Sequence, residues 1–267
     1  MLSEAQIQEF KANGYLNGGR VLDDETVEIL RAEIMRVIDD RDNSDAIQPL
    51  LLHNLSGNDD APVWQIVNIW GASEPFHQLI SQPEIVNMVA QLTDASEVRL
   101  WHDQIQYKPA RIGGVNMWHQ DSPYWPILTP MTEQVTAWVA LDDVDVDNGC
   151  MSMVPGSYHW GNNIDFLHTL KSYDAMPSEF QGHKLENVPR PVAKGEVHFH
   201  HALTWHGSFA NTSGRPRRAI ALHYMTDKTR YVESGNHVMK PFVEVKDGEK
   251  LEGKTFPRVY PVGSSEV

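Results

Sequence analysis

The chain has 267 residues, of which 41% are hydrophobic and 22% charged, enough to bury one sizeable core. Its net charge of −14, from 36 acidic and 22 basic residues, argues against nucleic acid and anionic membranes as partners. No apolar run approaches the roughly 20 residues of a membrane span, and the single cysteine, Cys150, excludes an internal disulfide and favours a cytoplasmic location.

The N-terminal part predicts two helices. Residues 3–16 form an amphipathic helix, with Ser3 as the N-cap and Gly14 near the end. Residues 23–41 form a second helix, whose buried face consists of four apolar residues at helical spacing, Val27, Leu30, Ile34 and Val37. A strand over 63–70 and a short helix over 83–93 follow.

From residue 97 the hydrophobic period changes to two, which is typical of strands. Short strands bounded by Gly, Pro and Asn are predicted over 98–109, 135–144, 149–156, 195–208 and 217–225. This order predicts a mainly β fold with flanking helices, either a barrel or a double-sheet jelly roll. We find no repeat and no boundary, so residues 1–267 are expected to form a single domain.

Two segments lie outside this pattern. Residues 161–190 are polar and weakly periodic, which indicates a lid insert or a disordered excursion. Residues 226–267 form a C-terminal extension that either closes over a site or packs against a second copy in a homodimer. The sequence leaves both alternatives open.

The stretch MWHQDSPYWP, residues 117–126, contains a candidate metal site. If it is a strand, His119 and Asp121 point to one face. His206 follows His119 by 87 residues and precedes Gly207, where the chain can turn sharply. Two imidazoles and one carboxylate are the facial triad of non-heme Fe(II) oxygenases. Arg217, eleven residues further on, can pair its guanidinium group with a carboxylate.

A second metal hypothesis uses the tract HFHHALTWH. His198 and His200 share one strand face and could join another ligand to bind zinc. We favour the interpretation that both lie on the outer face of the sheet, and that His201 points inward as a pocket residue.

Several segments together resemble the phytanoyl-CoA dioxygenase family of Fe(II)/2-oxoglutarate-dependent oxygenases. They are EFKANGYL, HQD, AW, DNGCMSMVPGS and HGSFANTSGRPRRAI, in the family's order over residues 3–225. The resemblance implies a cupin-like double-stranded β-helix that binds iron through His119, Asp121 and His206.

The resemblance also implies the residues that bind the co-substrate 2-oxoglutarate. Arg217 falls where the family's arginine binds the far carboxylate, and Trp138, Gln104 and Ser208 are expected to line the same pocket. Substrate contacts are expected from the walls around the iron, at five positions: Gln106, Tyr124, Trp125, His159 and His201.

In this family, 2-oxoglutarate and O2 are consumed, succinate and CO2 are released, and a substrate is oxidised. Asp121 argues against halogenation, because related halogenases have a small residue at that position. We therefore expect hydroxylation, with desaturation or epoxidation as alternatives. Lys108, Arg111 and Arg215 are too few to hold the phosphates of a coenzyme A thioester, so a small free metabolite is favoured over an acyl-CoA. A non-catalytic metal protein and a hydrolytic or isomerising cupin-type protein remain alternatives of another class.

Overall fold

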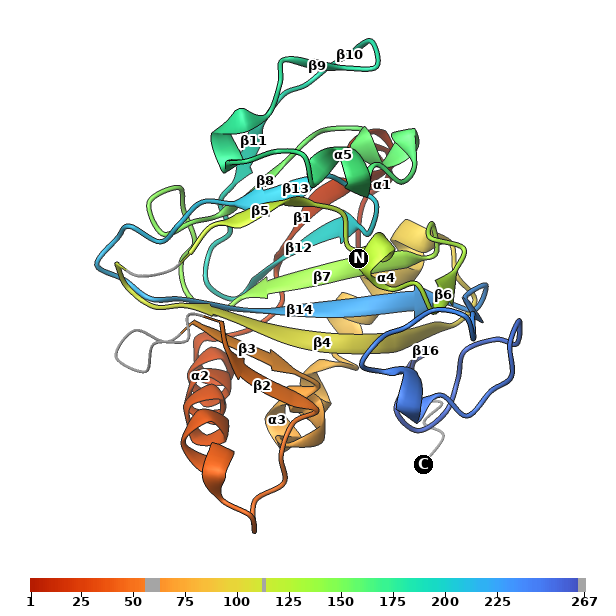
Figure 1. Cartoon of the computed structure of the whole chain (residues 1–267). Helices are drawn as coiled ribbons and strands as arrows, with labels where there is room; N and C mark the ends of the chain where they lie inside the picture. Colours follow the sequence, from red (N-terminus) through yellow and green to blue (C-terminus); the bar gives the residue numbers. More distant parts are fainter. Residues whose placement is uncertain (56–62, 112–113, 264–267) are drawn as a thin grey trace.

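Two facing antiparallel sheets form the centre of the computed structural model, which describes residues 1–55, 63–111 and 114–263 (Figure 1). The larger sheet has the order β1-β12-β7-β14-β4-β3-β2, with β16 also paired to β4. Its strands are β1 (Tyr15–Arg20), β12 (Glu196–His201), β7 (Gln134–Ala140), β14 (Arg217–Thr226), β4 (Val98–Lys108), β3 (Trp64–Val67), β2 (Leu51–Asn54) and β16 (Arg258–Tyr260).

The smaller sheet has the order β11-β8-β13-β5. Its strands are β11 (Val188–Arg190), β8 (Met151–Met153), β13 (His206–Ser208) and β5 (Asn116–His119). Two further pairs of short strands are β9 (Glu179–Phe180) with β10 (His183–Lys184), and β6 (Leu128–Thr129) with β15 (Arg230–Tyr231). This arrangement is the double-stranded β-helix, or jelly roll, that the sequence predicts.

The α-helices of the described residues are α1 (Glu4–Asn13), α2 (Asp24–Asp39), α3 (Glu74–Leu79), α4 (Pro83–Thr93) and α5 (Ile164–Leu167). Short 3₁₀ helices are η1 (Asp40–Asp42), η2 (Ile69–Gly71), η3 (Ser122–Tyr124), η4 (Ser157–Trp160), η5 (Tyr173–Ala175) and η6 (Lys240–Phe242). No helix in the described part of the chain is long and apolar enough to cross a membrane.

The main hydrophobic core lies between the larger sheet and helices α1 to α4. The predicted face of α2, including Leu30 and Ile34, packs in one cluster with Phe199 of β12 and Leu222 of β14. Burying each such side chain contributes about 1.5–3 kcal/mol. Because alternate strand residues point to opposite faces, this packing leaves the remaining residues of β7, β12 and β14 facing the space between the two sheets.

Most predicted elements are confirmed, with shifted ends. Ser3 caps α1, and the helix ends at Asn13 rather than at residue 16, because the C-cap Gly14 has φ +80° and turns the chain into β1. The strand expected over 195–208 is two strands, β12 and β13, which belong to different sheets. Strand β2 and helix α3 were not predicted.

The C-terminal extension packs on the chain's own larger sheet. Met239, Leu251 and Phe256 form a hydrophobic cluster with Trp101 of β4 and with Trp125. Residues 264–267 lie outside the described part. The extension therefore helps to close one end of the fold.

Candidate metal centre and cavity

Strands β5 and β13 bring the two predicted histidine ligands together. His206 of β13 is the register partner of His119 at the end of β5, and their ring centres lie 4.1 Å apart. A Cβ atom at Gly207 would lie 3.0 Å from the carbonyl oxygen of Asn116 and 3.3 Å from the backbone nitrogen of Trp118. Gly207 therefore permits close strand approach, and the expected turn at this position is wrong.

Asp121 reaches the histidines in a different way from the one expected. It lies beyond the end of β5, at the N-cap of η3, so the argument from a shared strand face is wrong. Its backbone N–H donates to the carbonyl of Ala202, in the turn between β12 and β13, at 2.8 Å. Asp121 Oδ1 then lies 3.7 Å from His119 Nε2 and 3.4 Å from His206 Nε2.

Backbone carbonyls set the orientation of both imidazoles. Nδ1 of His119 lies 2.7 Å from the carbonyl of Met117, and Nδ1 of His206 lies 2.9 Å from the carbonyl of Thr204. These bonds place the proton on Nδ1 and leave the Nε2 lone pair for a metal. The three donor atoms lie within 4.8 Å of one another, and neighbouring ligands of an ion are roughly 3 Å apart when each lies ~2.1 Å from it. A small inward movement of the three side chains would bring these donor atoms to the separations found around a non-heme iron ion.

The charges of the site also suit a cation. Burial raises the pKa of Asp121, but the imidazoles of His206 and His200 outweigh it and hold this pKa well below its usual range. Burial lowers the pKa of His119 to about 4. Burial also lowers the pKa of His206, but Asp121 outweighs it and raises this pKa overall. The site thus offers a carboxylate and a neutral imidazole, and a bound cation would displace the proton that Asp121 stabilises on His206.

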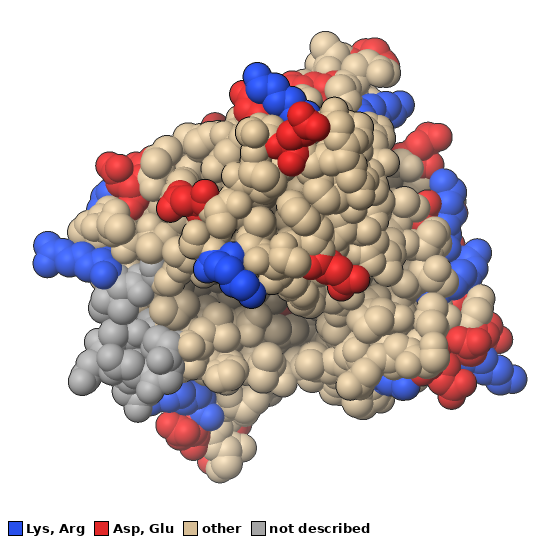
Figure 2. All heavy atoms as spheres, turned by 45° about the horizontal axis from the view of Figure 1, so that its top comes forward, with Lys and Arg blue, Asp and Glu red and all other residues tan. Residues whose placement is uncertain are grey.

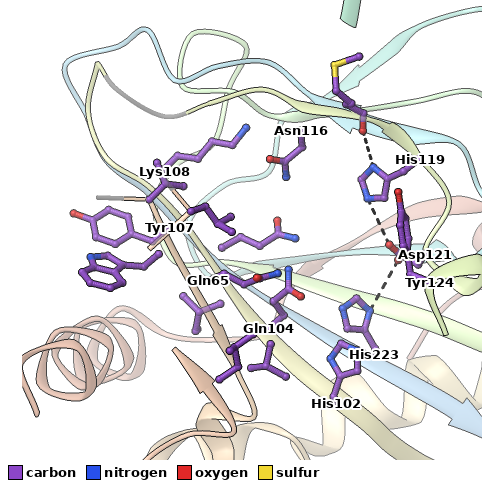
Figure 3. A pocket seen from close by; sticks show the side chains of 18 of the residues that line it. Gln65, His102, Gln104, Tyr107, Lys108, Asn116, His119, Asp121, Tyr124 and His223 are labelled. Atoms are coloured by element: carbon purple, nitrogen blue, oxygen red, sulfur yellow. Dashed lines mark hydrogen bonds and ion pairs between the residues drawn. The ribbon is translucent and has the colours of Figure 1, made fainter. Parts of the chain in front are cut away.

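A cavity of about 690 Å³ between the two sheets is lined by two members of this triad, His119 and Asp121 (Figure 3). The inner faces of β4 and β14 form one wall, along which register partners follow one another as Lys108–Arg217, Gln106–Ala219, Gln104–Ala221 and His102–His223. The wall therefore has a cationic end and an imidazole end, and Figure 3 shows Lys108 and His102 on opposite sides of Gln104.

The cationic end contains two buried bases. The guanidinium nitrogens of Arg217 are fully buried without a hydrogen-bond partner, and burial lowers its pKa to about 10. Lys108 Nζ donates to Ser208 Oγ and to the carbonyl of Phe209, both at 2.8 Å. Burial, together with the charge of Arg217, lowers the pKa of Lys108 to about 6. Two buried bases without an acidic partner are chemically suited to binding a carboxylate.

Trp138 forms the floor beside these bases. The Cζ atom of Arg217 lies 5.5 Å from the centre of the Trp138 ring, a cation–π distance. Trp138 Nε1 donates to Gln106 Oε1 at 3.2 Å. Trp138 and Ser208 also line a small cavity of about 20 Å³ beside the triad. The structure thus places Trp138 beside Arg217 and Ser208 beside Lys108, and their expected contact with 2-oxoglutarate stays a prediction.

At the imidazole end, three histidines from separate segments meet. The ring centre of His102 lies 4.6 Å from that of His223 and 5.9 Å from that of His237, which comes from the C-terminal extension. Burial lowers the pKa of His223 and His237 to about 4, and that of His102 well below its usual range. These imidazoles are therefore neutral at pH 7, and the edge of Trp125 packs against two of them.

The cavity lining includes several other residues that the sequence suggested. Gln104, Gln106, Tyr124 and Trp125 all line it. The hydroxyl of Tyr124 lies 2.8 Å from Nε2 of His168, just beyond α5 in the predicted lid insert. The predicted insert therefore contributes to the cavity mouth.

Four expectations about histidines are corrected. His159 is exposed and bonds the carbonyl of Lys11 at 3.1 Å, and His201 bonds the carbonyl of Thr132 at 3.2 Å. Neither lines the cavity. His198 and His200 are buried and face the space between the sheets, because their neighbours in β12, Val197 and Phe199, pack against the helices. Among the described residues, the candidate metal group is the triad, so the zinc hypothesis for His198 and His200 has no support.

The sequence interpretation missed the residues around the triad that do not carry a family motif. They are Thr136, His223, His102 and His237, whereas His200 was assigned to the outer face and Lys108 was considered only for the phosphates of coenzyme A. The period-two pattern could have indicated His223, because it lies six residues from Arg217 on the same strand and therefore shares its face, opposite to Leu222. Nothing in the local pattern places His237, since only tertiary packing brings it to the cavity.

Gln120, between the two ligands of the His-x-Asp stretch, holds the surrounding segments together. Its Nε2 donates to the carbonyls of Gly161 and Leu203, and its Oε1 accepts the N–H of Asn163 at 2.7 Å. The side chain is fully buried. It therefore fixes the start of the insert against the metal-bearing segment.

A triad of this type, inside a double-stranded β-helix and facing a buried arginine, is the architecture of a non-heme metal protein with an open coordination side. The chain matches the model of the phytanoyl-CoA dioxygenase (PhyH) family over residues 10–219, and it belongs to that family.

Known relatives agree with this assignment. A phytanoyl-CoA dioxygenase domain-containing protein 1 homolog of Caenorhabditis briggsae is 33% identical over 45% of this chain and 43% of its own length. The peroxisomal phytanoyl-CoA dioxygenase of Bos taurus is 24% identical over 92% of this chain and 76% of its own. The match to the nematode relative thus spans less than half of that protein.

Solved structures show the same fold. The non-heme alpha-ketoglutarate-dependent carbocyclase SnoK from nogalamycin biosynthesis is 26% identical, with a TM-score of 0.75 over 96% of both chains. EctD from S. alaskensis, solved with 2-oxoglutarate and 5-hydroxyectoine, is 19% identical, with a TM-score of 0.72 over 93% of this chain and 85% of its own.

Proposed function

We propose that the protein is an Fe(II)- and 2-oxoglutarate-dependent oxygenase that hydroxylates a small, uncharged metabolite and releases succinate and CO2. The observation that carries this proposal is one cavity lined by His119, Asp121 and the buried, unpartnered guanidinium of Arg217, with the third donor, His206, grouped with His119 and Asp121. A protein that only binds a metal has no use for a buried cation facing its site.

In this proposal, separate groups of residues would bind the two ends of 2-oxoglutarate. His119, Asp121 and His206 would hold the iron, which when bound supplies the oxidative chemistry with O2. Arg217 and Lys108 would bind the far carboxylate, with Ser208 orienting the Lys108 ammonium group. Trp138 would pack against the carbon chain between them.

The substrate would occupy the opposite end of the cavity, near His102, His223 and His237. Among the described residues that line the cavity, the Lys, Arg, Asp and Glu residues are Lys108, Asp121 and Arg217, and the co-substrate and iron would engage all three. The remaining wall combines the neutral imidazoles of His102, His223 and His237 and the amides of Gln104 and Gln106 with apolar side chains, including Leu51, Val67 and Ile105. This wall supports an uncharged substrate that accepts or donates hydrogen bonds.

The surface gives no support for a coenzyme A thioester. Of the three bases considered for its phosphates, Lys108 is buried inside the cavity and Arg215 is paired with Asp145. Figure 2 shows a hollow with Lys, Arg, Asp and Glu scattered singly around it on this face. A free metabolite is therefore favoured over an acyl-CoA, although the family includes proteins named for the latter.

Other oxidative outcomes remain open to this site. Solved relatives include the carbocyclase SnoK and the epimerase SnoN, the latter with Fe3+, alpha-ketoglutarate and nogalamycin RO. SnoN is 23% identical, with a TM-score of 0.73 over 96% of this chain and 98% of its own. Asp121 at the carboxylate position supports hydroxylation, cyclisation or epimerisation over halogenation.

Anaerobic spectroscopy tests the proposal. Addition of 2-oxoglutarate to the Fe(II) protein should produce a visible charge-transfer band, which His206→Ala should abolish. A screen of uncharged metabolites should then raise succinate formation above the level without substrate. The absence of the band in the parent protein would refute the assignment, and faster turnover of phytanoyl-CoA than of any free metabolite would refute the substrate class.

A further inference from the structure

The second carboxylate oxygen of Asp121 is held by two residues outside the triad. Oδ1 faces His119 and His206, whereas Oδ2 lies 3.0 Å from Thr136 Oγ1 and 3.2 Å from His200 Nε2. Thr136 of β7 and His200 of β12 are register partners in the larger sheet. Both are almost completely buried, at 0% and 2% exposure. The two donors therefore come from a rigid part of the fold.

The protons in this group can be assigned from the contacts. Thr136 donates its single hydroxyl proton to Asp121, so its oxygen accepts from Nδ1–H of His223, 2.8 Å away. His200 donates through Nε2–H, which fixes its neutral tautomer. His223 lines the main cavity, so a chain of donors runs from the proposed substrate end, through Thr136, to Asp121.

We propose that His200 and Thr136 are positioning residues that hold Oδ2 of Asp121 away from the metal, so that the carboxylate offers Oδ1 alone. This inference rests on the iron site of the proposed function. The two hydrogen bonds occupy both lone-pair sites of Oδ2, so to chelate the ion with both oxygens Asp121 would have to give up at least one of them inside a buried site. With one oxygen from Asp121 and two histidine nitrogens, an octahedral ion keeps three positions for other ligands.

The ring contacts support this role for His200. Its ring centre lies 4.6 Å from that of His206, so it packs against a metal ligand while it bonds another. Its Nδ1 atom is buried without a hydrogen-bond partner. His200 is thus held in place through Asp121 and His206 rather than through a bond of its own to the sheet.

Cobalt(II) titration of the full-length protein tests the proposal without turnover. In His200→Phe, which keeps the ring volume but loses the donor, the Kd for Co(II) should weaken about 10- to 100-fold. The visible d–d spectrum of the bound ion should also change. In His200→Gln, the amide Nε2 occupies nearly the same place as the imidazole Nε2, so affinity and spectrum should return close to those of the parent.

A second pair of variants and a matched control make the test independent of folding defects. Thr136→Val should weaken Co(II) binding, whereas Thr136→Ser, which keeps the hydroxyl, should not. His201→Phe changes the neighbouring buried histidine of the same strand, which faces away from the cavity, and should leave the Kd and spectrum as in the parent.

Two results would overturn the inference. One is parent-like Co(II) affinity and spectrum in both His200→Phe and Thr136→Val. The other is a His200→Gln variant as weak as His200→Phe, which would show that the donor is not what matters. A parent protein that fails to bind Co(II) would overturn this inference and the proposed function together. A parent that binds Co(II) but forms no succinate with Fe(II) and 2-oxoglutarate would overturn the proposed function alone.

Discussion

Replacing Arg217 with methionine should stabilise the protein without ligands while removing its response to 2-oxoglutarate. Methionine keeps a long, unbranched side chain in the buried space and removes an unpaired charge. Burial lowers the pKa of Arg217 from its ordinary value to about 10. The pKa of Arg217 lies well above neutral in both the folded and the unfolded protein, so the side chain is charged in both states at pH 7.5. The full cost of burying this charge therefore destabilises the folded protein at that pH.

The size of the effect follows from two opposing contributions. The lowered pKa corresponds to about 3 kcal/mol of destabilisation of the folded protein. The cation–π contact with Trp138 offsets about 1 kcal/mol of it. A net gain of about 2 kcal/mol should raise the Tm by roughly 4–8 °C, at about 2–4 °C per kcal/mol for a chain near this size.

Thermal unfolding with and without ligand measures both effects. In the Mn(II)-loaded parent, 2-oxoglutarate at 100 times its Kd should stabilise by about 2.7 kcal/mol, whereas Arg217→Met should gain little. The order of the two Tm values should then reverse. Arg218→Met is the matched control, because Arg218 bonds Asp142 through Nε and Nη2, at 2.9 and 2.8 Å. It should lower the Tm and keep the ligand response. A lower Tm for ligand-free Arg217→Met, or an undiminished response to 2-oxoglutarate, would contradict the reasoning.

Three further predictions concern other positions of the cavity and its surroundings. Lys108 has a pKa of about 6, and a bound carboxylate should raise it. Binding of 2-oxoglutarate above pH 6 should therefore take up a proton and weaken as the pH rises to 8. Calorimetry in buffers of different ionisation enthalpy measures this uptake, which Lys108→Met should abolish. Tyr124→Phe removes the hydroxyl bond to His168 and should speed hydrogen exchange in α5 while leaving the Kd for Co(II) unchanged; unchanged exchange would argue against a link between the insert and the cavity mouth. His159→Ala, at an exposed position, should change the free energy of unfolding by less than about 0.5 kcal/mol and leave succinate formation unaltered, and a loss of activity would restore His159 to the site.

The clustering of the three candidate ligands and the place of Arg217 in the cavity could be predicted from sequence, because their chemistry and order are specific together. His-x-Asp, a histidine 87 residues later and an arginine eleven residues beyond that rarely coincide without a shared role. The strand pattern supported them, because Arg217 alternates with Ile220 and Leu222 in a way that predicts opposite faces. The fold class followed from the same alternation and from the helical spacing of α2.

The sequence could not show in the same way which residues of β12 point toward the space between the sheets. Val197, His198, Phe199, His200 and His201 give no clear alternation, since histidine is accepted on either face of a strand. Only packing of Val197 and Phe199 against the helices decides that His200 points toward Asp121. The spacing of His119 and Asp121 predicted that Asp121 lies in a strand. Instead, a backbone hydrogen bond to Ala202, 81 residues away in sequence, sets the position of Asp121.

The arrangement of β4 and β14 divides the cavity into two chemically different halves. Register pairs Lys108 with Arg217 at one end and His102 with His223 at the other, roughly 20 Å further along the strands at about 3.3 Å per residue. Lys108 and Arg217 are buried without an acidic partner, whereas burial keeps the imidazoles of His102 and His223 neutral. A dicarboxylate is therefore drawn to one end only, and a second anionic molecule would find no partner near His102. In the proposed function, the same two strands that would position the co-substrate would thus also favour an uncharged substrate.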